Sequence, residues 1–442
     1  MGYPEALAYL DALGVDSMKK LAPSTQRMEA LCDLLNNPER AVPAIHITGT
    51  NGKSSTARIA TSLLTAAGLS VGTYTSPHLQ SPRERLAING EPIAPAAFGE
   101  LFDHIKPFVE TVEAKLGEPI SYFELLTGMF FLMAAETPVD AMVVEVGLGG
   151  RWDATNVILE SVPVVTNVNL DHTQMLGATT LEIAAEKVGI VKGGATLVTA
   201  ERVPDVLQVL AAQAPQIARI GRDFDVIENR VAFGGRYLSL RSSAATYEGL
   251  FLPLHGAHQG VNAATALEAV TRFIPARAIA ADVVAEGLST VTTRGRLESS
   301  HFEGSVVPIV LDVAHNPAGM SAMISSLVEA FAFERAIFVV GVLADKDHEG
   351  IMSEISRVEG TVITCEARSS RSVPAEQLAE VTRAFGIEAE AQADVRDALD
   401  RARELAGEAD LICVTGSHYV VGEARDVLLP SHAEKKTDMG KR

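Results

Sequence analysis

Short apolar runs and longer amphipathic runs alternate along the chain from Ala44 onward. The short runs are rich in β-branched residues, as buried strands are, whereas the longer runs repeat apolar residues at helical spacing. The strand candidates of the first half are Ala44–Thr48, Val71–Thr75, Ala141–Val146, Pro163–Val168 and Ala195–Thr199. The helix candidates are Lys53–Ala67, Tyr122–Glu136, Thr180–Val191 and Pro204–Ala214. This alternation predicts an α/β fold with a doubly wound, mostly parallel sheet.

The pattern changes after Arg230. Two alternating runs, Val231–Ser242 and Tyr247–Pro253, predict a small antiparallel ribbon. The polar segment Thr292–Arg296 marks a domain boundary, after which strand and helix patterns alternate again and predict a smaller, Rossmann-like α/β domain. We therefore expect an N-terminal domain over 1–296 and a C-terminal domain over 297–442.

Composition narrows the class of protein. A chain of 442 residues with 47% hydrophobic and 21% charged residues has globular composition and is long enough for two or three domains. Its net charge of -19, from 37 basic and 56 acidic residues, disfavours a dedicated nucleic-acid binder, because phosphate backbones are held mainly by Lys and Arg. Small molecules are the expected partners, and an anionic one would need local positive charge at its site.

The cysteines and the apolar segments indicate the compartment. Cys32, Cys365 and Cys413 are scattered and form no CxxC pair, which favours a reducing environment. The longest apolar stretch, Leu125 to Ala135, is too short to cross a bilayer, and the first residues lack a basic targeting region. We expect a cytoplasmic protein without a membrane segment.

A glycine-containing turn between a strand and a helix is the strongest chemical signal. It reads Gly49-Thr50-Asn51-Gly52-Lys53-Ser54. Glycines let backbone amides approach phosphate oxygens, the helix N-terminus and Lys53 add positive charge, and Ser54 can reach magnesium. The generic phosphate loop would need Gly where Ile47 stands, so a turn without a ligand stays the alternative.

Polar residues also follow other predicted strands, at the edge where open α/β sheets bind ligands. They are Ser76, Glu145 and His172. Glu145 is a magnesium ligand, or it caps a neighbouring amide or pairs with Arg151. His172 beside Asp171 contacts metal or substrate, or it has a structural role. The convergence of these strand ends predicts one site.

With these residues in place, the chain resembles the Mur ligase superfamily of ATP-dependent amide-forming enzymes. Within it, the resemblance is to folylpolyglutamate synthases, including the bifunctional dihydrofolate synthase form. The family's short phosphate loop, GTNGK[ST], explains the missing glycine at Ile47. Further matching motifs are Thr75–Leu79, Ser121–Glu124, Glu145–Asn156, Leu170–Thr173, Glu186–Ile190, His258–Ala264, Gly295–Glu298 and Leu311–Pro317.

The resemblance implies a role for each matching residue. It makes Thr50, Asn51, Gly52, Lys53 and Ser54 the phosphate loop for ATP, with Asn262, Arg296 and Asp312 as further ATP contacts. Ser76 and Glu145 become ligands of one Mg²⁺ and His172 of a second. Phe123, Asp153 and Ala154 form the pteridine side of a folate pocket, where a planar ring stacks on an aromatic face.

The resemblance also assigns roles to Lys187 and His315, and the residues themselves leave an alternative for each. Lys187 resembles the lysine that the superfamily carbamylates with CO₂, which would turn a cation into an oxygen ligand, but by pattern alone it is a solvated helix lysine. Lys53, Lys187 and His315 are the expected catalytic residues. His315 resembles a residue near the reacting carboxylate or the incoming amine, and it could equally cap the following helix.

The loop after Ser76 leaves one question open. Arg83 or Arg85 meets a carboxylate of the substrate, or both belong to a surface ion pair centred on Glu84. Trp152, the only tryptophan, stands where the family pattern suggests an aliphatic residue.

The resemblance implies ATP-dependent ligation of L-glutamate to folates, and also to dihydropteroate, through an acyl phosphate. The expected partners are these small molecules, with ATP and Mg²⁺ bound at the domain interface and the protein acting as a monomer. Another Mur-type amino-acid ligase is the nearer alternative. A non-catalytic P-loop switch is the farther one, and its GTPase form is disfavoured because no Lys follows Asn167-Val168-Asn169 as an NKxD motif requires.

Overall fold

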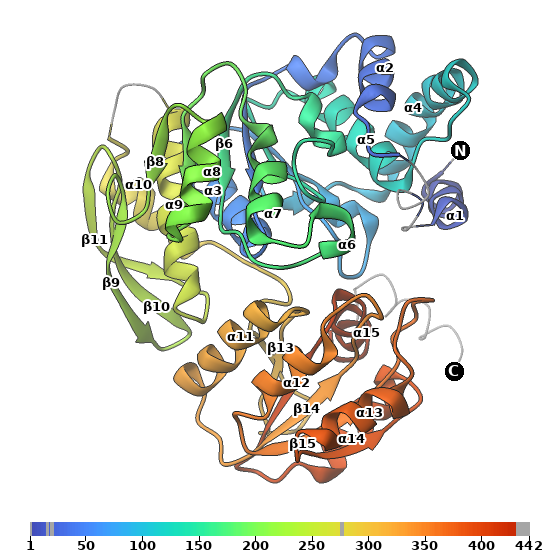
Figure 1. Cartoon of the computed structure of the whole chain (residues 1–442), viewed down its shortest axis with the longest axis vertical. Coiled ribbons are helices and arrows are strands. Elements are labelled where there is room, and N and C mark those ends of the chain that lie inside the picture. Colours follow the sequence, from blue (N-terminus) through green and yellow to red (C-terminus); the bar gives the residue numbers. More distant parts are fainter. Residues whose placement is uncertain (1, 15–16, 18–21, 275–277, 430–442) are drawn as a thin grey trace. The chain divides into compact units, whose positions relative to one another are not determined.

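The parallel sheet that the strand pattern predicts is present in the computed structural model, which describes residues 2–14, 17, 22–274 and 278–429 (Figure 1). The chain divides into two compact units. The first unit comprises Met1–Arg230, Tyr237–Pro253 and Gln259–Val291, and the second comprises Val231–Arg236, Leu254–His258 and Thr292–Arg442. Among the described helices, none combines the length and apolar character that a bilayer span requires.

The main sheet of the first unit has the strand order β4-β3-β2-β5-β1-β6-β7-β8. Strands β2, β5, β1, β6, β7 and β8 pair in parallel, whereas β3 and β4 form an antiparallel edge. The bounds are β1 Ala44–Thr48, β2 Val71–Tyr74, β3 Leu86–Ile88, β4 Glu91–Pro92, β5 Ala141–Glu145, β6 Ser161–Val165, β7 Leu197–Thr199 and β8 Ile217–Arg219. The predicted fold class is confirmed.

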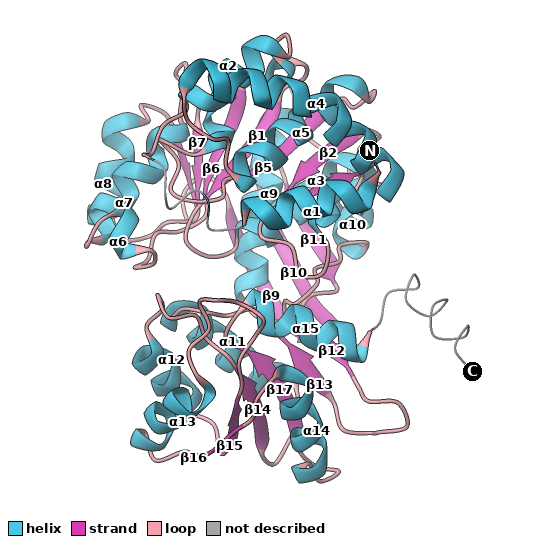
Figure 2. Cartoon of the chain, turned by 90° about the vertical axis from the view of Figure 1, so that its right-hand side faces the viewer, coloured by secondary structure: helices cyan, strands magenta, loops and turns pink. Residues whose placement is uncertain are grey.

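Helices cover both faces of this sheet, as adjacent residues of β2 show. A Cβ on Gly72 would lie 3.6 Å from the Phe130 ring of α5 (Tyr122–Glu136). The next residue, Thr73, bonds through its hydroxyl to Thr61 of α3 (Lys53–Ala66) at 2.7 Å. Because successive strand residues point to opposite faces, α5 and α3 lie on opposite sides of the sheet (Figure 2).

The other helices of this unit complete its layers. Helix α4 packs on α1 and α5, and α10 packs on α3. Their bounds are α1 Tyr3–Leu13, α2 Gln26–Leu34, α4 Pro95–Leu116, α6 Thr173–Leu176, α7 Thr180–Lys187, α8 Pro204–Gln213, α9 His258–Phe273 and α10 Ala281–Ser289. Short 3₁₀ turns are η2 Pro38–Arg40, η3 Pro82–Arg85, η4 Ala154–Val157 and η5 Val188–Ile190.

The antiparallel ribbon has three strands rather than the two predicted runs. Strands β9 (Asp225–Ala232), β10 (Gly235–Arg241) and β11 (Thr246–Leu252) form a sheet in the order β11-β10-β9. The expected single run Val231–Ser242 is wrong, because the chain reverses at Phe233 and Gly234. Gly234 has φ 73°, a conformation that glycine adopts without steric cost.

The second unit has its own sheet, in the order β12-β13-β17-β14-β15-β16. All pairs are parallel except β12 with β13. The strands are β12 Glu298–Ser300, β13 Ile309–Leu311, β14 Ala336–Val340, β15 Gly360–Thr364, β16 Glu388–Ala391 and β17 Leu411–Thr415. The helices are α11 Pro317–Ala330, α12 His348–Ile355, α13 Ala375–Ala384, α14 Val395–Leu405 and α15 His418–Leu428.

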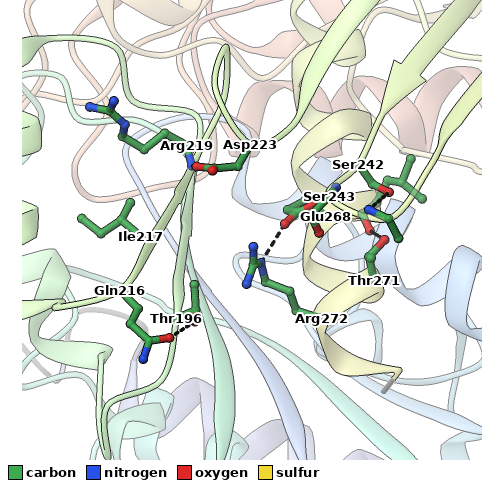
Figure 3. A network of polar contacts seen from close by, with 12 residues as sticks. Thr196, Gln216, Ile217, Arg219, Asp223, Ser242, Ser243, Glu268, Thr271 and Arg272 are labelled. Atoms are coloured by element: carbon green, nitrogen blue, oxygen red, sulfur yellow. Dashed lines mark hydrogen bonds and ion pairs between the residues drawn. The ribbon is translucent and has the colours of Figure 1, made fainter. Parts of the chain in front are cut away.

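A buried carboxylate fastens α9 to the turn between β10 and β11 (Figure 3). Glu268 is fully buried, accepts a hydrogen bond from the Ser243 N–H at 2.8 Å, and pairs with Arg272 Nε at 2.7 Å. Six residues earlier on the same helix lies Asn262, one of the expected ATP contacts. The network therefore anchors the helix that carries part of the expected site.

We predict that Glu268→Ala lowers the free energy of unfolding by about 1–3 kcal/mol, because it removes the hydrogen bonds that this buried carboxylate accepts from the Ser243 N–H and from Arg272 Nε. Chemical denaturation of the variant beside the parent chain measures this loss. Glu390→Gln serves as the control, since it breaks an ion pair with Arg401 that is about one-third exposed and worth roughly 0–1 kcal/mol. Equal losses in the two variants would contradict the prediction.

Candidate active site

The turn between β1 and α3 is packed so closely that two of its positions require glycine. Gly49 has φ 147°, and a Cβ there would lie 1.8 Å from the Thr166 hydroxyl oxygen. Gly52 has φ 82°, and a Cβ there would lie 2.5 Å from Asn262 Oδ1. The turn is thus held between the end of β6 and helix α9, whose Asn262, an expected ATP contact, lies against the loop.

The segment after β6 forms the floor of this loop. The Asn51 N–H donates to Asn167 Oδ1 at 3.0 Å, and the Thr50 N–H donates to the Asn167 carbonyl at 2.9 Å. Thr166 donates its hydroxyl to the Asn51 carbonyl at 2.6 Å. Sequence reasoning missed Asn167 as a member of the site, although its place directly behind a predicted strand was a usable signal.

Two lysines converge on one carbonyl of the loop. Lys53 Nζ donates to the Gly49 oxygen at 3.1 Å, and Lys187 Nζ donates to the same oxygen at 2.8 Å. Lys187 is only 4% exposed, so it is not the solvated helix lysine that pattern alone suggests. Burial, and then the charge of Lys53, lower the pKa of Lys187 to about 7. Near neutral pH its amine is therefore partly unprotonated.

A buried carboxylate connects three strand ends. Glu145, 1% exposed, accepts from Ser54 Oγ at 2.9 Å through Oε1 and from the Ser76 N–H at 3.0 Å through Oε2. The bond from the Ser76 N–H is the amide contact of the alternative interpretation, whereas Arg151 donates to the Ala185 carbonyl and to Gln213. The cluster offers one carboxylate and two hydroxyl-bearing residues, which are oxygen ligands of the kind that Mg²⁺ prefers.

The remaining ligands of such an ion would come from elsewhere. Within the described ranges, no group of three or more His, Cys, Asp or Glu residues is arranged to hold a metal. Mg²⁺ commonly keeps waters and binds through one or two carboxylates together with substrate phosphates. The donors at Glu145, Ser54 and Ser76 fit an ion that binds with a nucleotide.

His172 lies at the start of the short helix α6. Its backbone is left-handed, with φ 49°, and its Nε2 lies 3.9 Å from Asp171 Oδ1. The side chain is about one-third exposed, so its ring is accessible to a ligand.

The residues expected on the folate side surround the loop after β5. The Phe123 ring packs directly on Gly147, where a Cβ would lie 2.5 Å from the ring, and its centroid is 5.8 Å from that of Tyr74. Asp153 caps η4, whose first residue is the buried Ala154. Its carboxylate accepts from the Leu148 N–H at 2.9 Å and from the Thr155 hydroxyl at 2.6 Å. Burial raises the pKa of Asp153, and these bonds oppose the rise.

The second unit collects the other expected residues on the loop that follows β13. Asp312 accepts from the Leu297 and Ala314 N–H groups, both at 2.9 Å, and burial raises its pKa while Arg296 opposes the rise. His315 Nδ1 lies 2.9 Å from the Val313 carbonyl, which can only accept, so this nitrogen carries the proton. The cap of α11 is Asn316, which accepts from the Gly319 N–H at 2.8 Å.

One further histidine lies beside His315. The ring of His418, the first residue of α15, has its centroid 5.4 Å from that of His315. Strands β13 and β17, which precede the two histidines, are neighbours in the sheet. Sequence reasoning missed His418, because only the strand order shows that these two loops are adjacent.

The sheet, the short phosphate loop and the buried carboxylate define a nucleotide-binding α/β protein of the P-loop type. Two family models match the chain: the Mur ligase middle domain over residues 47–270 and the Mur ligase glutamate ligase domain over residues 295–418.

Similar proteins narrow the assignment. The dihydrofolate synthase/folylpolyglutamate synthase of Mycobacterium tuberculosis is 39% identical, over 92% of this chain and 90% of that protein. The structure of the M. tuberculosis folylpolyglutamate synthase complexed with ADP has a TM-score of 0.90 at 38% identity, over 96% of this chain and 98% of that one. A bifunctional folylpolyglutamate synthase/dihydrofolate synthase with Mn, AMPPNP and L-glutamate bound has a TM-score of 0.84 at 27% identity, over 97% and 98% of the two chains. The chain belongs to the Mur ligase family, in its folylpolyglutamate synthase/dihydrofolate synthase branch.

We predict that Lys187→Met is more stable than the parent chain at pH 7. The pKa of Lys187 is about 7 in the folded protein and near its ordinary value of 10.5 when unfolded, so the unfolded state binds more protons between these pH values. The parent chain should therefore gain stability as pH rises from 7 toward 10.5, whereas the variant lacks this contribution. The melting temperatures of the two proteins are measured in bicarbonate-free buffer from pH 7 to 10.5. A difference between them that stays constant with pH would contradict the prediction.

Proposed function

We propose that the protein uses ATP to ligate L-glutamate to folates, and also to dihydropteroate. The observation that carries the proposal is the convergence of Lys53, Lys187 and the Glu145 cluster around the short phosphate loop. The relatives named above support it in two ways. Their names describe folate ligases, and their structures contain ADP, or AMPPNP with Mn and L-glutamate.

The proposed reaction follows from the chemistry of carboxylates. An amine does not displace oxide from a carboxylate at a useful rate, so the carboxylate of the folate first attacks the γ-phosphate of ATP and releases ADP. The acyl phosphate that forms is then attacked by the amine of L-glutamate, which expels phosphate and leaves an amide. Lys53 and the loop amides bind the transferring group and stabilise its charge.

Several chain residues have proposed supporting roles. Mg²⁺, held by Glu145 with Ser54 and Ser76, and a second ion at His172, would neutralise phosphate charge when bound. Asn262, Arg296 and Asp312 contact ATP, and His315 orients the reacting carboxylate or the amine. Phe123, Asp153 and Ala154 form the pteridine side of the folate pocket.

We further propose that Lys187 is carbamylated. Its unprotonated amine attacks CO₂ and loses a proton, so that a buried cation beside Lys53 becomes an anionic oxygen donor. The support is its burial and its pKa of about 7, which leaves neutral amine available. We also propose the domain limits 1–296 and 297–442, a monomeric state and a cytoplasmic location, the last supported by three free, buried cysteines.

Product analysis tests the main proposal. Purified protein with ATP, Mg²⁺ and L-glutamate should release phosphate when dihydropteroate or tetrahydrofolate is added, and mass spectrometry should show each product heavier by one glutamate residue. Lys53→Ala should slow phosphate release by about 100-fold or more while the melting temperature is retained. Phosphate release without an amide product would identify an ATPase instead, and a product only from a nucleotide-linked peptide would identify another Mur-type ligase.

The carbamate has a separate test. Lys187→Ala should be inactive, and short-chain carboxylic acids should partly restore activity by supplying the missing oxygen atoms. Primary amines of similar size are the control, because they fill the space but supply no carboxylate. Full activity of the variant without additives, or equal rescue by amines, would contradict carbamylation.

A further inference from the structure

Arg85 is a buried arginine at the edge of the first unit's sheet. It is the last residue of η3 and is 5% exposed. Its carbonyl accepts a hydrogen bond from the Thr75 N–H at 3.3 Å, which places it beside the carboxyl end of β2. Open α/β sheets bind their ligands outside this end of the strands.

Within the part of the chain that the structure describes, the contacts of the Arg85 guanidinium are uncharged. Its Nε donates to His78 Nδ1 at 3.0 Å. The Nδ1 of His78 therefore carries no proton and accepts this bond through its lone pair. The guanidinium carbon lies 5.3 Å from the centre of the Tyr122 ring, and the Arg85 charge opposes the rise that burial causes in the pKa of the Tyr74 phenol. Burial and the Arg85 charge lower the pKa of His78 to about 3, which keeps this neighbour neutral.

The other buried arginines of the described residues show what Arg85 lacks. Arg27 pairs with Glu124 at 2.8 Å, Arg236 pairs with Glu329 at 2.8 Å, and Arg425 pairs with Glu298. Over the described ranges, no carboxylate pairs with Arg85. The adjacent Glu84 accepts from the backbone N–H groups of Leu79, Gln80 and Ser81.

Among the described residues no side chain compensates the Arg85 charge, and this favours an anionic ligand beside it. A buried charge without a counter-charge is costly, and a guanidinium with open N–H donors matches the geometry of a carboxylate. Tyr122 and Tyr74 connect Arg85 to Phe123, the ring expected beneath the pteridine. The phosphate loop has its own cation, Lys53, for the ATP phosphates.

The terminal glutamate of a folate has two carboxylates, and ATP activates one of them. We propose that Arg85 binds the other, non-reacting carboxylate. This inference rests on the proposed function. Dihydropteroate carries a single carboxylate, which is consumed in the reaction, whereas a folate that already has glutamate carries a second one. Arg85 thus favours the extension of glutamylated folates and contributes little to the first ligation.

The variant Arg85→Gln tests this assignment through the two acceptors. Its KM for tetrahydrofolate should rise about 10- to 100-fold, as loss of a charge-assisted hydrogen bond predicts, while its KM for dihydropteroate changes less than about threefold. Arg85→Lys should fall between the parent and the glutamine variant. The matched control is Arg83→Gln in the same turn, where Arg83 donates to the Ile93 carbonyl at 2.8 Å, and any effect there should fall equally on both acceptors.

A second measurement compares two ligands on the same protein. Tetrahydrofolate whose non-reacting carboxylate is replaced by a carboxamide should bind the parent protein about 10- to 100-fold more weakly than tetrahydrofolate, measured by calorimetry. Arg85→Gln should bind the two compounds equally. The parent protein shows whether the carboxylate is recognised, and the loss of the preference in Arg85→Gln assigns that recognition to Arg85.

Three results would overturn the assignment: equal losses with both acceptors, a rise confined to the KM for L-glutamate, or equal binding of the acid and the amide by the parent protein. Failure of the proposed function is a different result. In that case the parent protein would form no glutamylated product with either acceptor.

Discussion

The close approach of the phosphate loop to its surroundings is the constraint on which the site depends. At Gly49 and Gly52 the backbone occupies space that a Cβ would need, with Thr166 on one side and Asn262 on the other. This packing exposes the Gly49 carbonyl to the amines of Lys53 and Lys187. Two protonated amines on one oxygen repel each other, and burial of Lys187 resolves the conflict by lowering its pKa to about 7. The loop thus brings together two lysines that are distant along the chain, and burial together with the Lys53 charge lowers the pKa of Lys187.

The loops around this turn are held by carboxylates that bond to backbone N–H groups. Glu84 fixes the turn after β2, Asp153 fixes the loop after β5, and Asp312 does the same after β13 in the second unit. A carboxylate that accepts such bonds satisfies buried donors and shapes the backbone without a basic partner. Basic side chains near these loops, such as Arg85, are then available to an anionic ligand.

The differences between predicted and observed elements have local physical causes. The apolar run Pro163–Val168 was predicted as one strand, but β6 is Ser161–Val165, because Thr166 and Asn167 turn away to bond the phosphate loop. Val168 is buried there without being in a strand, and its N–H donates to Glu201. Similarly, apolar and polar residues alternate from Val231 to Ser242 without a break at the hairpin turn. Alternation alone therefore does not show where one strand ends and the next begins.

Short-range patterns of apolar, glycine and polar residues were enough to predict the βαβ order, the phosphate-loop turn and the positions of Ser76 and Glu145 at strand ends. The sequence also indicated the ligase family through motifs that retain their order. The folded arrangement was needed to show that Lys187 is buried, that Asn167 supports the loop, and that Arg27 pairs with a carboxylate whereas Arg85, among the described residues, does not. Burial and charge pairing depend on neighbours that are distant along the chain, and these neighbours are defined only once the sheet brings its loops together.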